Sequence, residues 1–546
     1  MAESRHIPRR RNPVLSEDKY FQTLTQEELW QRYCGFFDLS LDEFMSIQEH
    51  LLMEQIGLVA GSPLGKKIMG NNKPGSVEEF RRAVPLTMYD DYEPYLSERQ
   101  EDVLAVKPYL WCHSAGRRGE FKWIPHSSQI VEKAVRSYLG AFILASASQK
   151  GEINIKPGFR GLTVLPPAPY TSGSIIHALT QHISMQLIPP LETEAMEFDE
   201  RAKIGFQMAL KGGVDIIGSL ISILVGIGEE FSEQTHSSGF SMSMLHPKVA
   251  LQFLKAWLQS KREGRTILPR DLWKPKGIVA VGLDATIYRD KVAYYWGKPP
   301  YELYAYTEAL VCAMQNWNKR ALTFLPDMVF LEFIPQEEQF KHEADKNYQP
   351  STVLLNEVEE GKSYEVVITH FYGMPLLRYQ TNDVIKVIAL KDDEAGINLP
   401  QIIFQRKVGE VINLANLAHL DQKTIWQAIA NTGIKFADWV ATKEYDLDRS
   451  QLSLYIELNE KRDANQLANM IDEQLKMVDP DYKDIDSYLH YQPVKVTPLS
   501  AGTFMRYAEK KKEEGASLAQ LKPPHMNLSN AMISQLLQLS RERPIK

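Results

Sequence analysis

The feature that most constrains this chain is a short glycine-containing loop between two apolar runs. From Tyr109 to Pro125 the sequence reads Y-L-W-C-H-S-A-G-R-R-G-E-F-K-W-I-P. Glycines let backbone N–H groups converge on an anion, and two arginines with a following lysine add charge that suits phosphate. The pattern predicts a phosphate-binding loop, with an exposed basic turn as the alternative. The residues of the predicted loop are Ser114, Ala115, Gly116, Arg117, Arg118, Gly119 and Lys122.

Length and charge narrow the class of protein. A chain of 546 residues exceeds what one hydrophobic core usually supports, so we expect at least two domains. Hydrophobic residues make up 44% and charged residues 24%, which is ordinary for a globular protein. The formal net charge of -7 argues against a nucleic-acid partner, whereas a small anionic ligand needs only local positive charge.

Cysteine spacing and the apolar runs bear on the compartment. Cys34, Cys112 and Cys312 show no paired spacing, so we expect reduced, mostly buried thiols. Residues 1–15 are basic without an apolar core, which predicts a disordered tail and no signal peptide. Ile216 to Ile227 is too short to span a bilayer. It predicts a buried helix, with membrane contact as the alternative, and we expect a cytoplasmic protein with no integral membrane segment.

Apolar periodicity predicts an alternation of helices and strands in the first 400 residues. Ser76 is the expected N-cap of a short helix that ends at Val84-Pro85. Three strand-like runs, G-I-V-A-V-G-L, V-A-Y-Y-W and Y-E-L-Y-A-Y, follow Lys276, and two antiparallel strands are expected at 327–335 and 363–371. The other predicted elements are helices at 26–56, 127–147, 199–224 and 247–262, and a strand at 161–165 followed by the turn-rich loop P-P-A-P-Y-T-S-G-S, which either lines a pocket or is a surface loop.

A polar cluster ends the third strand-like run. Tyr306, Thr307 and Glu308 place an aromatic ring, a hydroxyl and a carboxylate together after a buried strand. Hard oxygen ligands suit Mg²⁺, which commonly bridges a protein carboxylate to nucleotide phosphate, and a tyrosine ring can stack on a base. The alternative is that Thr307 caps a helix over 310–314 and Glu308 complements its dipole.

A second carboxylate follows the strand at 363–371. Asp383 lies in G-M-P-L-L-R-Y-Q-T-N-D-V-I-K-V, between an expected turn and a strand, where its two oxygens could accept both ribose hydroxyls. Taken alone, an Asp after Asn is also a common turn residue.

The C-terminal part predicts its own domain. Helices are expected at 422–432, 464–478 and 503–514, the last closed by Gly515, with strands at 436–442, 452–458 and 494–496. This alternation indicates a small α+β domain over residues 409–546, joined to a domain over 16–408 by a linker near Lys407–Asn413.

In order and spacing, the chain resembles the Gretchen Hagen 3, or auxin-responsive promoter, family of acyl acid amido synthetases, a branch of the adenylate-forming enzymes. The resemblance rests on an ordered set of motifs along nearly the whole chain. These are F-R-R-A-V-P-L-T-M-Y-D-D-Y-E-P-Y, H-S-A-G-R-R-G-E-F-K-W-I-P, A-Y-T-E, V-F-L-E-F-I-P, L-R-Y-Q-T-N-D-V, F-Q-R-K-V-G-E-V-I-N-L, and G-T-F through E-G-A-S-L-A-Q-L-K-P-P-H.

The resemblance implies a fold and a reaction. The fold would be α/β: a large N-terminal adenylate-forming-type domain, made of α/β subdomains and a β-rich subdomain, with a smaller mobile α+β C-terminal domain. The reaction would be ATP- and Mg²⁺-dependent adenylation of a small carboxylic acid, followed by acyl transfer to an amine, with an amino acid as the expected acceptor. By resemblance, residues Ser114 to Lys122 would hold the phosphates, Thr307 and Glu308 would meet the α-phosphate and Mg²⁺, Tyr306 would lie at the adenine, Asp383 would hold the ribose, Arg406 would lie near the hinge, and Lys522 would be the mobile catalytic lysine.

Two departures from the family pattern keep other readings open. The family loop is rich in Ser and Thr, whereas Ala115, Gly116, Arg117 and Arg118 stand here, and Gln380 and Asn382 replace the usual Arg and Gly. The arginines could substitute charge-assisted hydrogen bonds for hydroxyl contacts. The alternatives are an adenylate-forming ligase with a thiol acceptor, such as coenzyme A or a carrier protein, and a catalytically degenerate nucleotide-binding relative.

Overall fold

The computed structural model describes residues 15–541 except 115–121, 197, 238–246, 282–284, 346, 409–410, 415–417, 447–448, 459, 484–492 and 515–521. The chain divides into two compact units. The larger comprises the described residues up to Ser114, with Lys122–Thr381 and Lys386–Phe404, and the smaller comprises Asn382–Ile385 and the chain from Gln405 onward. The sequence predicts the boundary at residue 409, whereas the division falls at Gln405 and also assigns Asn382–Ile385 to the smaller unit. The expected tail lies outside the described residues except for Leu15.

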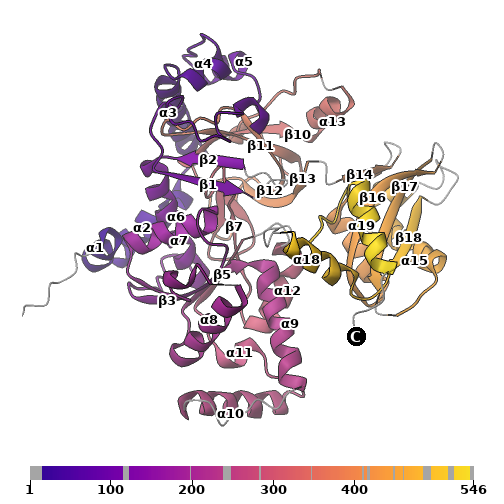
Figure 1. Ribbon diagram of the computed structural model, residues 1–546. Helices are drawn as coiled ribbons and strands as arrows, with labels where there is room; N and C mark the ends of the chain where they lie inside the picture. The colour runs from indigo at the N-terminus through magenta and orange to yellow at the C-terminus, as the bar shows by residue number, and fades with distance from the viewer. Residues whose placement is uncertain are drawn as a thin grey trace, which may run out of the picture. The chain divides into compact units, whose positions relative to one another are not determined.

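An eleven-stranded sheet runs through the larger unit, in the order β10-β11-β12-β13-β9-β8-β7-β6-β5-β3-β4 (Figure 1). The half from β7 to β4 is parallel, and its short apolar strands suit a sheet that is covered on both faces. The pairs β7–β8, β8–β9, β9–β13 and β10–β11 are antiparallel. The strands are β3 (Phe159–Val164), β4 (Met185–Ile188), β5 (Ile216–Leu220), β6 (Gly277–Val281), β7 (Tyr301–Tyr304), β8 (Ala313–Gln315), β9 (Leu322–Phe324), β10 (Val329–Pro335), β11 (Ser363–His370), β12 (Tyr379–Ala389) and β13 (Gln401–Lys407).

Helices surround this sheet. One buried cluster joins strands of the parallel half to helices α8, α9, α10, α11 and α12. A Cβ added at Gly140 would lie 2.5 Å from the carbonyl oxygen of Tyr33, so glycine allows α6 to approach α2 closely. The helices of the larger unit are α1 (Ser16–Thr23), α2 (Gln26–Cys34), α3 (Leu41–Val59), α4 (Pro63–Met69), α5 (Val77–Ala83), α6 (Ser128–Ser146), α7 (Thr171–His182), α8 (Phe198–Gly212), α9 (Ile221–Ser237), α10 (Pro247–Arg262), α11 (Pro269–Leu272), α12 (Ala285–Trp296) and α13 (Gln336–Ala344).

Local capping explains where the N-terminal helices begin. Thr25 and Ser40 each form a capping box, and the two boxes start α2 and α3, respectively. The second start, at Ser40, interrupts the continuous helix expected over 26–56. The Ser76 hydroxyl accepts a hydrogen bond from the Glu79 backbone, and the helix stops at Val84, as its sequence predicts. The helices expected at 127–147 and 247–262 are also confirmed.

Three further predictions of helices and strands in this unit are wrong. The apolar run Ile216 to Ile227 is strand β5 followed by the start of α9, because a short apolar run fits a buried strand as well as a buried helix. The same strand ends the helix expected over 199–224, which stops at Gly212. V-A-Y-Y-W, expected as a strand, is the last part of helix α12.

Two short strands flank the predicted phosphate-binding loop. β1 (Leu110–Ser114) and β2 (Lys122–His126) pair antiparallel, with Ser114 opposite Lys122 at the end next to the loop. The two outermost residues of the predicted loop are therefore fixed by a hairpin ladder, whereas Ala115, Gly116, Arg117, Arg118 and Gly119 lie outside the described residues.

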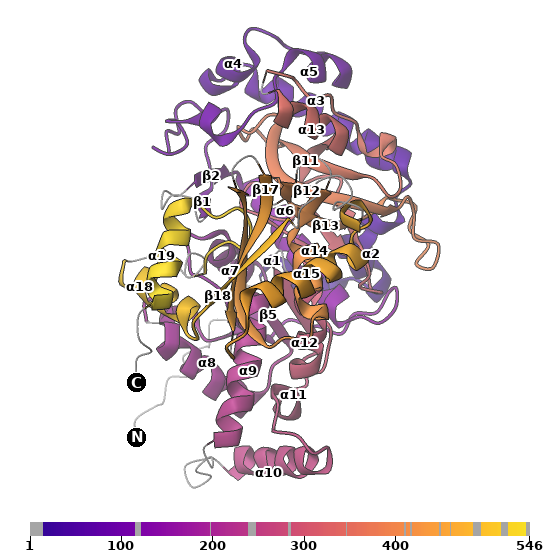
Figure 2. The same cartoon turned by 90° about the vertical axis from the view of Figure 1, so that its right-hand side faces the viewer.

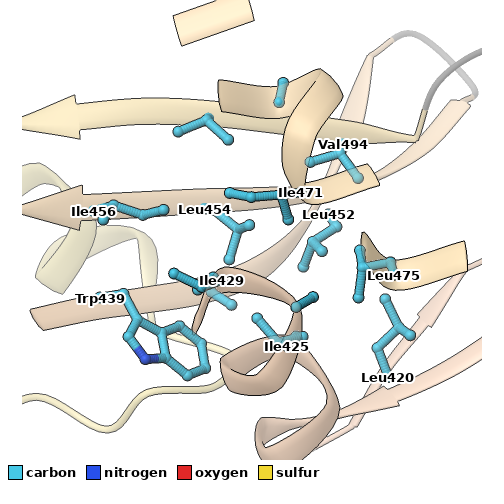
Figure 3. Close-up of a cluster of buried hydrophobic side chains, with 14 of the residues drawn as sticks. Leu420, Ile425, Ile429, Trp439, Leu452, Leu454, Ile456, Ile471, Leu475 and Val494 are labelled. Carbon is cyan, nitrogen blue, oxygen red and sulfur yellow. The ribbon is translucent and has the colours of Figure 1, made fainter. Parts of the chain in front are cut away.

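The smaller unit is built on a three-stranded sheet, β16-β17-β18. Alternate residues of its strands face two separate clusters, one with α14 and α15 (Figure 3) and one with α18 and α19. The rotated view in Figure 2 shows helices on both faces of this sheet. Its elements are β14 (Val411–Leu414), β15 (Ala418–Asp421), α14 (Gln422–Asn431), β16 (Phe436–Asp446), β17 (Arg449–Leu458), α15 (Ala464–Val478), α16 (Pro480–Lys483), β18 (Val494–Leu499), α18 (Thr503–Glu513) and α19 (Asn530–Arg541).

The α+β character expected for this part is confirmed. Each helix and strand predicted from 422 onward is present, with bounds that differ by a few residues. Gly515, the expected C-cap of α18, lies outside the described residues. The cysteines agree with the sequence as well: Cys34, Cys112 and Cys312 are buried free thiols. Among the helices described, none is long and apolar enough to cross a bilayer.

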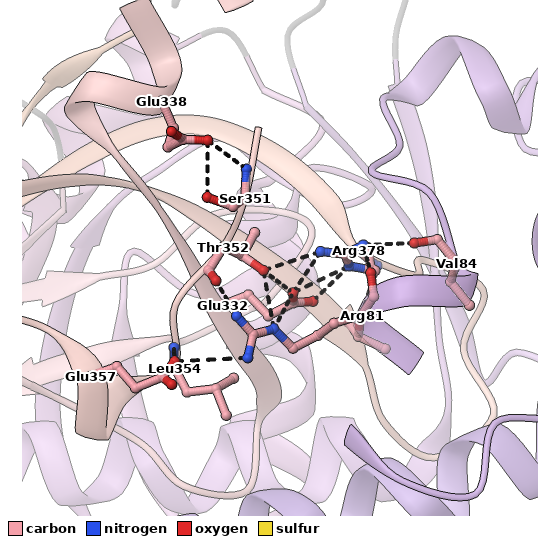
Figure 4. Close-up of polar contacts among 10 residues, drawn as sticks. Arg81, Val84, Glu332, Glu338, Ser351, Thr352, Leu354, Glu357 and Arg378 are labelled. Carbon is pink, nitrogen blue, oxygen red and sulfur yellow. Dashed lines mark hydrogen bonds and ion pairs between the residues drawn. The ribbon is translucent and has the colours of Figure 1, made fainter. Parts of the chain in front are cut away.

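A buried ion pair ties four segments of the larger unit together (Figure 4). Arg378 and Glu332 are 5% and 1% exposed, and Arg378 Nη2 donates to Glu332 Oε1 over 2.8 Å. Its Nη1 donates to the carbonyl oxygens of Arg81 (2.5 Å) and Val84 (2.7 Å), and its Nη2 also donates to Thr352 Oγ1 (3.1 Å). With Nε also bonded to Glu332, all five guanidinium donors are satisfied, which offsets the cost of burying the charge.

Glu332→Ala should leave the buried Arg378 without its counter-charge. We expect the free energy of unfolding to fall by about 3 to 5 kcal/mol, measured by chemical denaturation. The control is Glu337→Ala, because Glu337 pairs with Lys362 over 3.3 Å at an exposed site, and its loss should cost less than about 0.5 kcal/mol. Equal small losses in the two variants would show that the buried pair contributes no more than a surface pair.

Candidate active site

The predicted cluster Tyr306-Thr307-Glu308 forms a tight turn after β7. The Leu310 backbone N–H donates to the Tyr306 carbonyl oxygen over 2.8 Å, and the Cys312 N–H donates to the Tyr304 carbonyl oxygen over 2.8 Å. Leu310 has a φ of 60°, so the chain turns there into β8 and no helix follows. The alternative interpretation, in which Thr307 caps a helix over 310–314, is therefore wrong.

Glu308 is held through its backbone and its side chain. His370 Nε2 donates to the Glu308 carbonyl oxygen over 2.6 Å, and Tyr379 donates its hydroxyl to Glu308 Oε1 over 3.1 Å. These partners come from the end of β11 and the start of β12. A half-buried carboxylate fixed by two neighbouring strands is preorganised for a ligand instead of searching many rotamers.

Thr307 connects this turn to the loop P-P-A-P-Y-T-S-G-S. Thr171, the first residue of α7, donates its hydroxyl to Thr307 Oγ1 over 2.8 Å. The preceding residues of the same loop bond to the hairpin, because the His113 N–H donates to the Pro169 carbonyl oxygen over 3.2 Å. The His113 ring packs edge-on against Tyr170, with ring centres 4.4 Å apart. The structure thus brings the hairpin, this loop and the Thr307-Glu308 turn together.

A fourth segment of the larger unit joins this cluster. Within F-R-R-A-V-P-L-T-M-Y-D-D-Y-E-P-Y, the Tyr89 hydroxyl accepts a hydrogen bond from the Trp123 N–H of β2 over 2.8 Å. Lys122 Nζ lies 5.2 Å from the centre of the Tyr89 ring. Burial, with added repulsion from Glu93 and Glu308, raises the pKa of Tyr89 to about 12. Lys122 and Glu308 therefore both lie near one neutral tyrosine.

Two buried histidines, His126 and His370, contact the backbone of the Thr307-Glu308 turn. Burial lowers the pKa of His126 to about 3, with repulsion from His370 adding to the effect, and the His126 ring hydrogen-bonds the Thr307 backbone. Burial likewise lowers the pKa of His370 to about 4. Because His370 Nε2 donates to a carbonyl oxygen, its Nδ1 is the acceptor for the Leu376 N–H, over 3.4 Å. Two neutral rings thus fix the backbone of the turn without adding charge next to Glu308.

The neutral His126 should make stability depend on pH. In the unfolded chain His126 binds a proton below a pKa of about 6.5, whereas in the folded chain it stays neutral. The free energy of unfolding therefore falls by about 1.4 kcal/mol per pH unit as the pH falls toward 4. His126→Phe should remove this contribution and lower the slope of the unfolding free energy against pH between about pH 6.5 and 4, where His370 still contributes its own slope.

The matched control for His126→Phe is His50→Gln, because the His50 side chain is 73% exposed. Its profile should follow the unmutated protein. A His126→Phe profile parallel to the unmutated one would show that His126 titrates equally in the folded and unfolded chains.

Asp383 and Arg406 belong to the smaller unit. Asp383 lies on β12, 3% exposed, and its Oδ1 pairs with Lys407 Nζ at the end of β13. The sequence expected Asp383 between a turn and a strand, and the structure places it within the strand just after Asn382, whose φ is 60°. Arg406 is 5% exposed, and its Nη1 donates to the Lys407 carbonyl oxygen over 3.4 Å. Lys407, the ion-pair partner of Asp383, was not singled out in the sequence.

Lys522 lies beside the edge strand of the smaller sheet. The residues after it add to β16, since the Ala441 N–H donates to the His525 carbonyl oxygen over 2.6 Å and the Asn527 N–H donates to the Ala441 carbonyl oxygen over 2.8 Å. The Lys522 side chain is 69% exposed, and its Nζ is 3.6 Å from Asp438 Oδ2. The segment is anchored, while the ammonium group stays accessible to a ligand.

The site residues that sequence reasoning missed are Tyr89, His126, His370, Tyr379 and Lys407. His126 and His370 each end an apolar strand, K-W-I-P-H and S-Y-E-V-V-I-T-H, and a polar residue at a strand end is the signal that could have found them. Tyr89 and Tyr379 carry no such signal, because their roles come from contacts between distant segments.

Comparison with known proteins assigns the family. Models of the GH3 family match the chain three times: the N-terminal domain at residues 34–158, the central domain at 322–407 and the C-terminal domain at 422–531. These matches occur in chain order and together take in more than half of the 546 residues. The chain belongs to the GH3 family. The resemblance seen in the sequence motifs is thereby confirmed.

Curated GH3 relatives match parts of the chain. It is 29% identical over 226 residues to jasmonoyl–L-amino acid synthetase GH3.5 of Oryza sativa subsp. japonica, covering 39% of this chain and 38% of the relative. It is 26% identical over 347 residues to the GH3 domain-containing protein of Mus musculus, covering 58% of this chain and 60% of the relative. In both cases the match spans less than two thirds of the relative's length.

Solved structures confirm the fold class over most of the chain. The acyl acid amido synthetase AtGH3.15 in complex with 2,4-DB aligns with a TM-score of 0.65 at 17% identity, covering 94% of this chain and 96% of that one. A 2-hydroxyisobutyryl-CoA ligase in the postadenylation state, in complex with 2-HIB-AMP, aligns with a TM-score of 0.56 at 13% identity, covering 92% of each chain. The GH3 chain described here therefore has the α/β fold shared by these adenylate-forming enzymes.

Proposed function

We propose that this GH3 protein is an ATP- and Mg²⁺-dependent ligase, which adenylates a carboxylic acid and transfers the acyl group to an amine, an amino acid being the expected acceptor. The observation that carries the proposal is the Thr307-Glu308 turn, fixed by His370, Tyr379 and Thr171 beside the hairpin of the predicted phosphate-binding loop. Membership of a family whose relatives are named amido synthetases supports the amine as acceptor.

The residues at the turn fit Mg²⁺ that arrives with the nucleotide. Among the described residues, no group of three or more His, Cys, Asp or Glu side chains could hold a metal ion by itself. Mg²⁺ typically binds one or two carboxylates together with substrate phosphates and waters, which suits the single carboxylate of Glu308. When bound there, the ion would neutralise charge on the phosphates during transfer. Glu308 would supply the protein ligand, and Tyr379 would keep that carboxylate oriented.

The positive charge of Lys122 suits the phosphates of ATP. We assign Ser114, Ala115, Gly116, Arg117, Arg118, Gly119 and Lys122 to phosphate binding, with Thr307 near the α-phosphate and Tyr306 near the adenine. The position of Lys122 beside Tyr89 supports this assignment, because it leaves an ammonium at the base of the loop. Asp383 is assigned to the ribose and Arg406 to the hinge region.

The chemistry explains why a mobile lysine is required. Attack of the acid's carboxylate on the α-phosphorus of ATP forms a P–O bond and releases pyrophosphate, so negative charge builds at the phosphorus and on the leaving group. An ammonium such as Lys522 stabilises that charge. The amine then attacks the acyl carbonyl, AMP leaves, and the lysine is no longer needed. We place the reaction in the cytoplasm, where ATP is present and buried thiols stay reduced.

The test of the reaction is an acid-by-acceptor screen with mass spectrometry and pyrophosphate exchange. With the right acid, exchange should require ATP and Mg²⁺, and the acyl group should appear on an amino acid. Glu308→Gln should lower the exchange rate about 100-fold or more with little change in melting temperature, because only a ligand charge is removed. The exposed Glu360→Gln is the control and should leave the rate unchanged.

Other outcomes of that screen would contradict the proposal. Acyl transfer to coenzyme A or a carrier protein, with no amide, would replace the amine by a thiol acceptor. Absence of exchange with every acid, together with no ATP binding by calorimetry, would identify a degenerate nucleotide-binding relative. Full exchange in Glu308→Gln would remove Glu308 from the metal site.

Lys522→Ala should separate the two half-reactions. We expect pyrophosphate exchange to fall by several orders of magnitude, since loss of a preorganised charge at a developing anion costs on the order of 3 to 4 kcal/mol. Given synthetic acyl-adenylate and amine, the same variant should form amide at nearly the unmutated rate. Lys512→Ala, at an exposed position on α18, serves as the control. Equal loss in both half-reactions would point to a misfolded domain, and no loss in either would exclude Lys522 from catalysis.

A further inference from the structure

Helix α10 has apolar side chains on two opposite faces. On its inner face Val249, Phe253 and Ala256 are buried in the cluster shared with α8, α9, α11 and α12. On its outer face Leu251 is 53%, Leu254 42%, Trp257 48% and Leu258 51% exposed. These are four of the thirteen large hydrophobic side chains that are exposed in the described part of the chain, gathered within eight residues. Such a concentration differs from the isolated apolar residues normal on protein surfaces.

The outer residues form one continuous stripe. Leu251, Leu254 and Leu258 are spaced by three and four residues, so they lie above one another on a single side of the helix. Figures 1 and 2 both show α10 at an edge of the larger unit, beyond α9 and α11. The stripe therefore lies on a helix that the fold leaves at its periphery.

Basic side chains border this stripe. From Pro247 to Arg262 the helix contains Lys248, Lys255, Lys261 and Arg262 and no acidic residue, in a chain whose net charge is -7. Lys255, Lys261 and Arg262 are exposed. Lys261 Nζ lies 5.9 Å from the centre of the Trp257 ring, so charge and exposed apolar surface are adjacent. Glu263, just beyond the helix, is engaged by Arg265 and Arg270.

We propose that the outer face of α10, formed by Leu251, Leu254, Trp257 and Leu258, docks the protein on an anionic lipid surface. Leucine and tryptophan on one side with lysine and arginine beside them are the features of a helix that lies in the plane of a membrane interface. The apolar stripe enters the boundary between headgroups and acyl chains, and the basic side chains stay at the level of the anionic headgroups. This inference is independent of the proposed reaction.

Charge and area both argue against a second copy of the chain as the occupant. A symmetric contact through this face would bring two helices together that each carry four basic and no acidic residues. Four side chains of one helix also offer far less than the roughly 800 Å² per partner that stable dimers bury. An anionic bilayer matches the charge and needs no complementary shape.

Flotation of the full chain with lipid vesicles tests the proposal. We expect binding to vesicles containing about one third phosphatidylserine and none to pure phosphatidylcholine, with binding weakened when salt rises from about 0.1 to 0.5 M. Leu254→Ser combined with Leu258→Ser should lower the partition constant at least about tenfold, since each leucine withdrawn from water contributes a factor of that order. Lys255→Glu combined with Lys261→Glu should remove the preference for anionic lipid.

Leu58→Ser with Met477→Ser is the matched control, because these side chains are 49% and 75% exposed on other helices. It should bind vesicles like the unmutated protein. Failure of the unmutated chain to float with anionic vesicles would overturn the proposal, as would flotation that neither α10 double variant reduces. Dimers in light scattering that Leu254→Ser with Leu258→Ser dissociates would assign the face to a second copy. Retention on polyglutamate without flotation would assign it to an acidic polypeptide.

Discussion

The site in the larger unit depends on one buried ion pair, between Arg378 and Glu332. An isolated buried charge is too costly to persist, so the pair is stable only because every guanidinium donor has a partner. Those partners lie on β10, in the last turn of α5 and at Val84 just after it, and at Thr352. One arginine therefore fixes segments separated by more than 200 residues. Its φ of 46° is unusual for a non-glycine residue, a local cost of about 1 to 3 kcal/mol that the network holds in place.

The consequence appears at the next residue. Since Arg378 is held in place, Tyr379 begins β12 in a defined register. Two hydrogen bonds to Thr87 secure this register: the Thr87 N–H donates to the Arg378 carbonyl oxygen over 2.9 Å, and the Gln380 N–H donates to the Thr87 carbonyl oxygen over 2.9 Å. Tyr379 can then present its hydroxyl to Glu308. Burial, with the nearby Glu308 carboxylate, raises the pKa of Tyr379 well above its usual value, so the hydroxyl remains a donor. A structural ion pair thus determines where the carboxylate of Glu308, the proposed Mg²⁺ ligand, points.

Much of this arrangement was predictable, and the reasons for the failures are physical. Elements with a strong local signal, such as the Ser76-capped helix and the strands and helices of the smaller unit, could be read from periodicity and capping. The secondary structure was predicted wrongly for Ile216 to Ile227 and for V-A-Y-Y-W, because short apolar runs do not distinguish a buried strand from a buried helix. The predicted phosphate-binding loop, the loop P-P-A-P-Y-T-S-G-S and the Tyr306-Thr307-Glu308 cluster could each be identified in the sequence. The hydrogen bonds that hold Thr307 and Glu308 in place could not. His370 and Tyr379 reach Glu308, and Thr171 reaches Thr307, only after the sheet has formed, and no sequence spacing encodes these contacts.

The two units hold their charged groups in different ways, and the difference suits their proposed roles. Glu308 has hydrogen bonds on its carbonyl and carboxylate oxygens from buried partners, so its position is set before any ligand arrives. Lys522 is 69% exposed and lies 3.6 Å from Asp438, a separation at which a solvated pair contributes little. A metal ligand gains from being fixed, because the ion tolerates little variation in geometry. A lysine required in one half-reaction and absent from the next gains from a weak resting contact, because every contact it keeps must be broken before it can act.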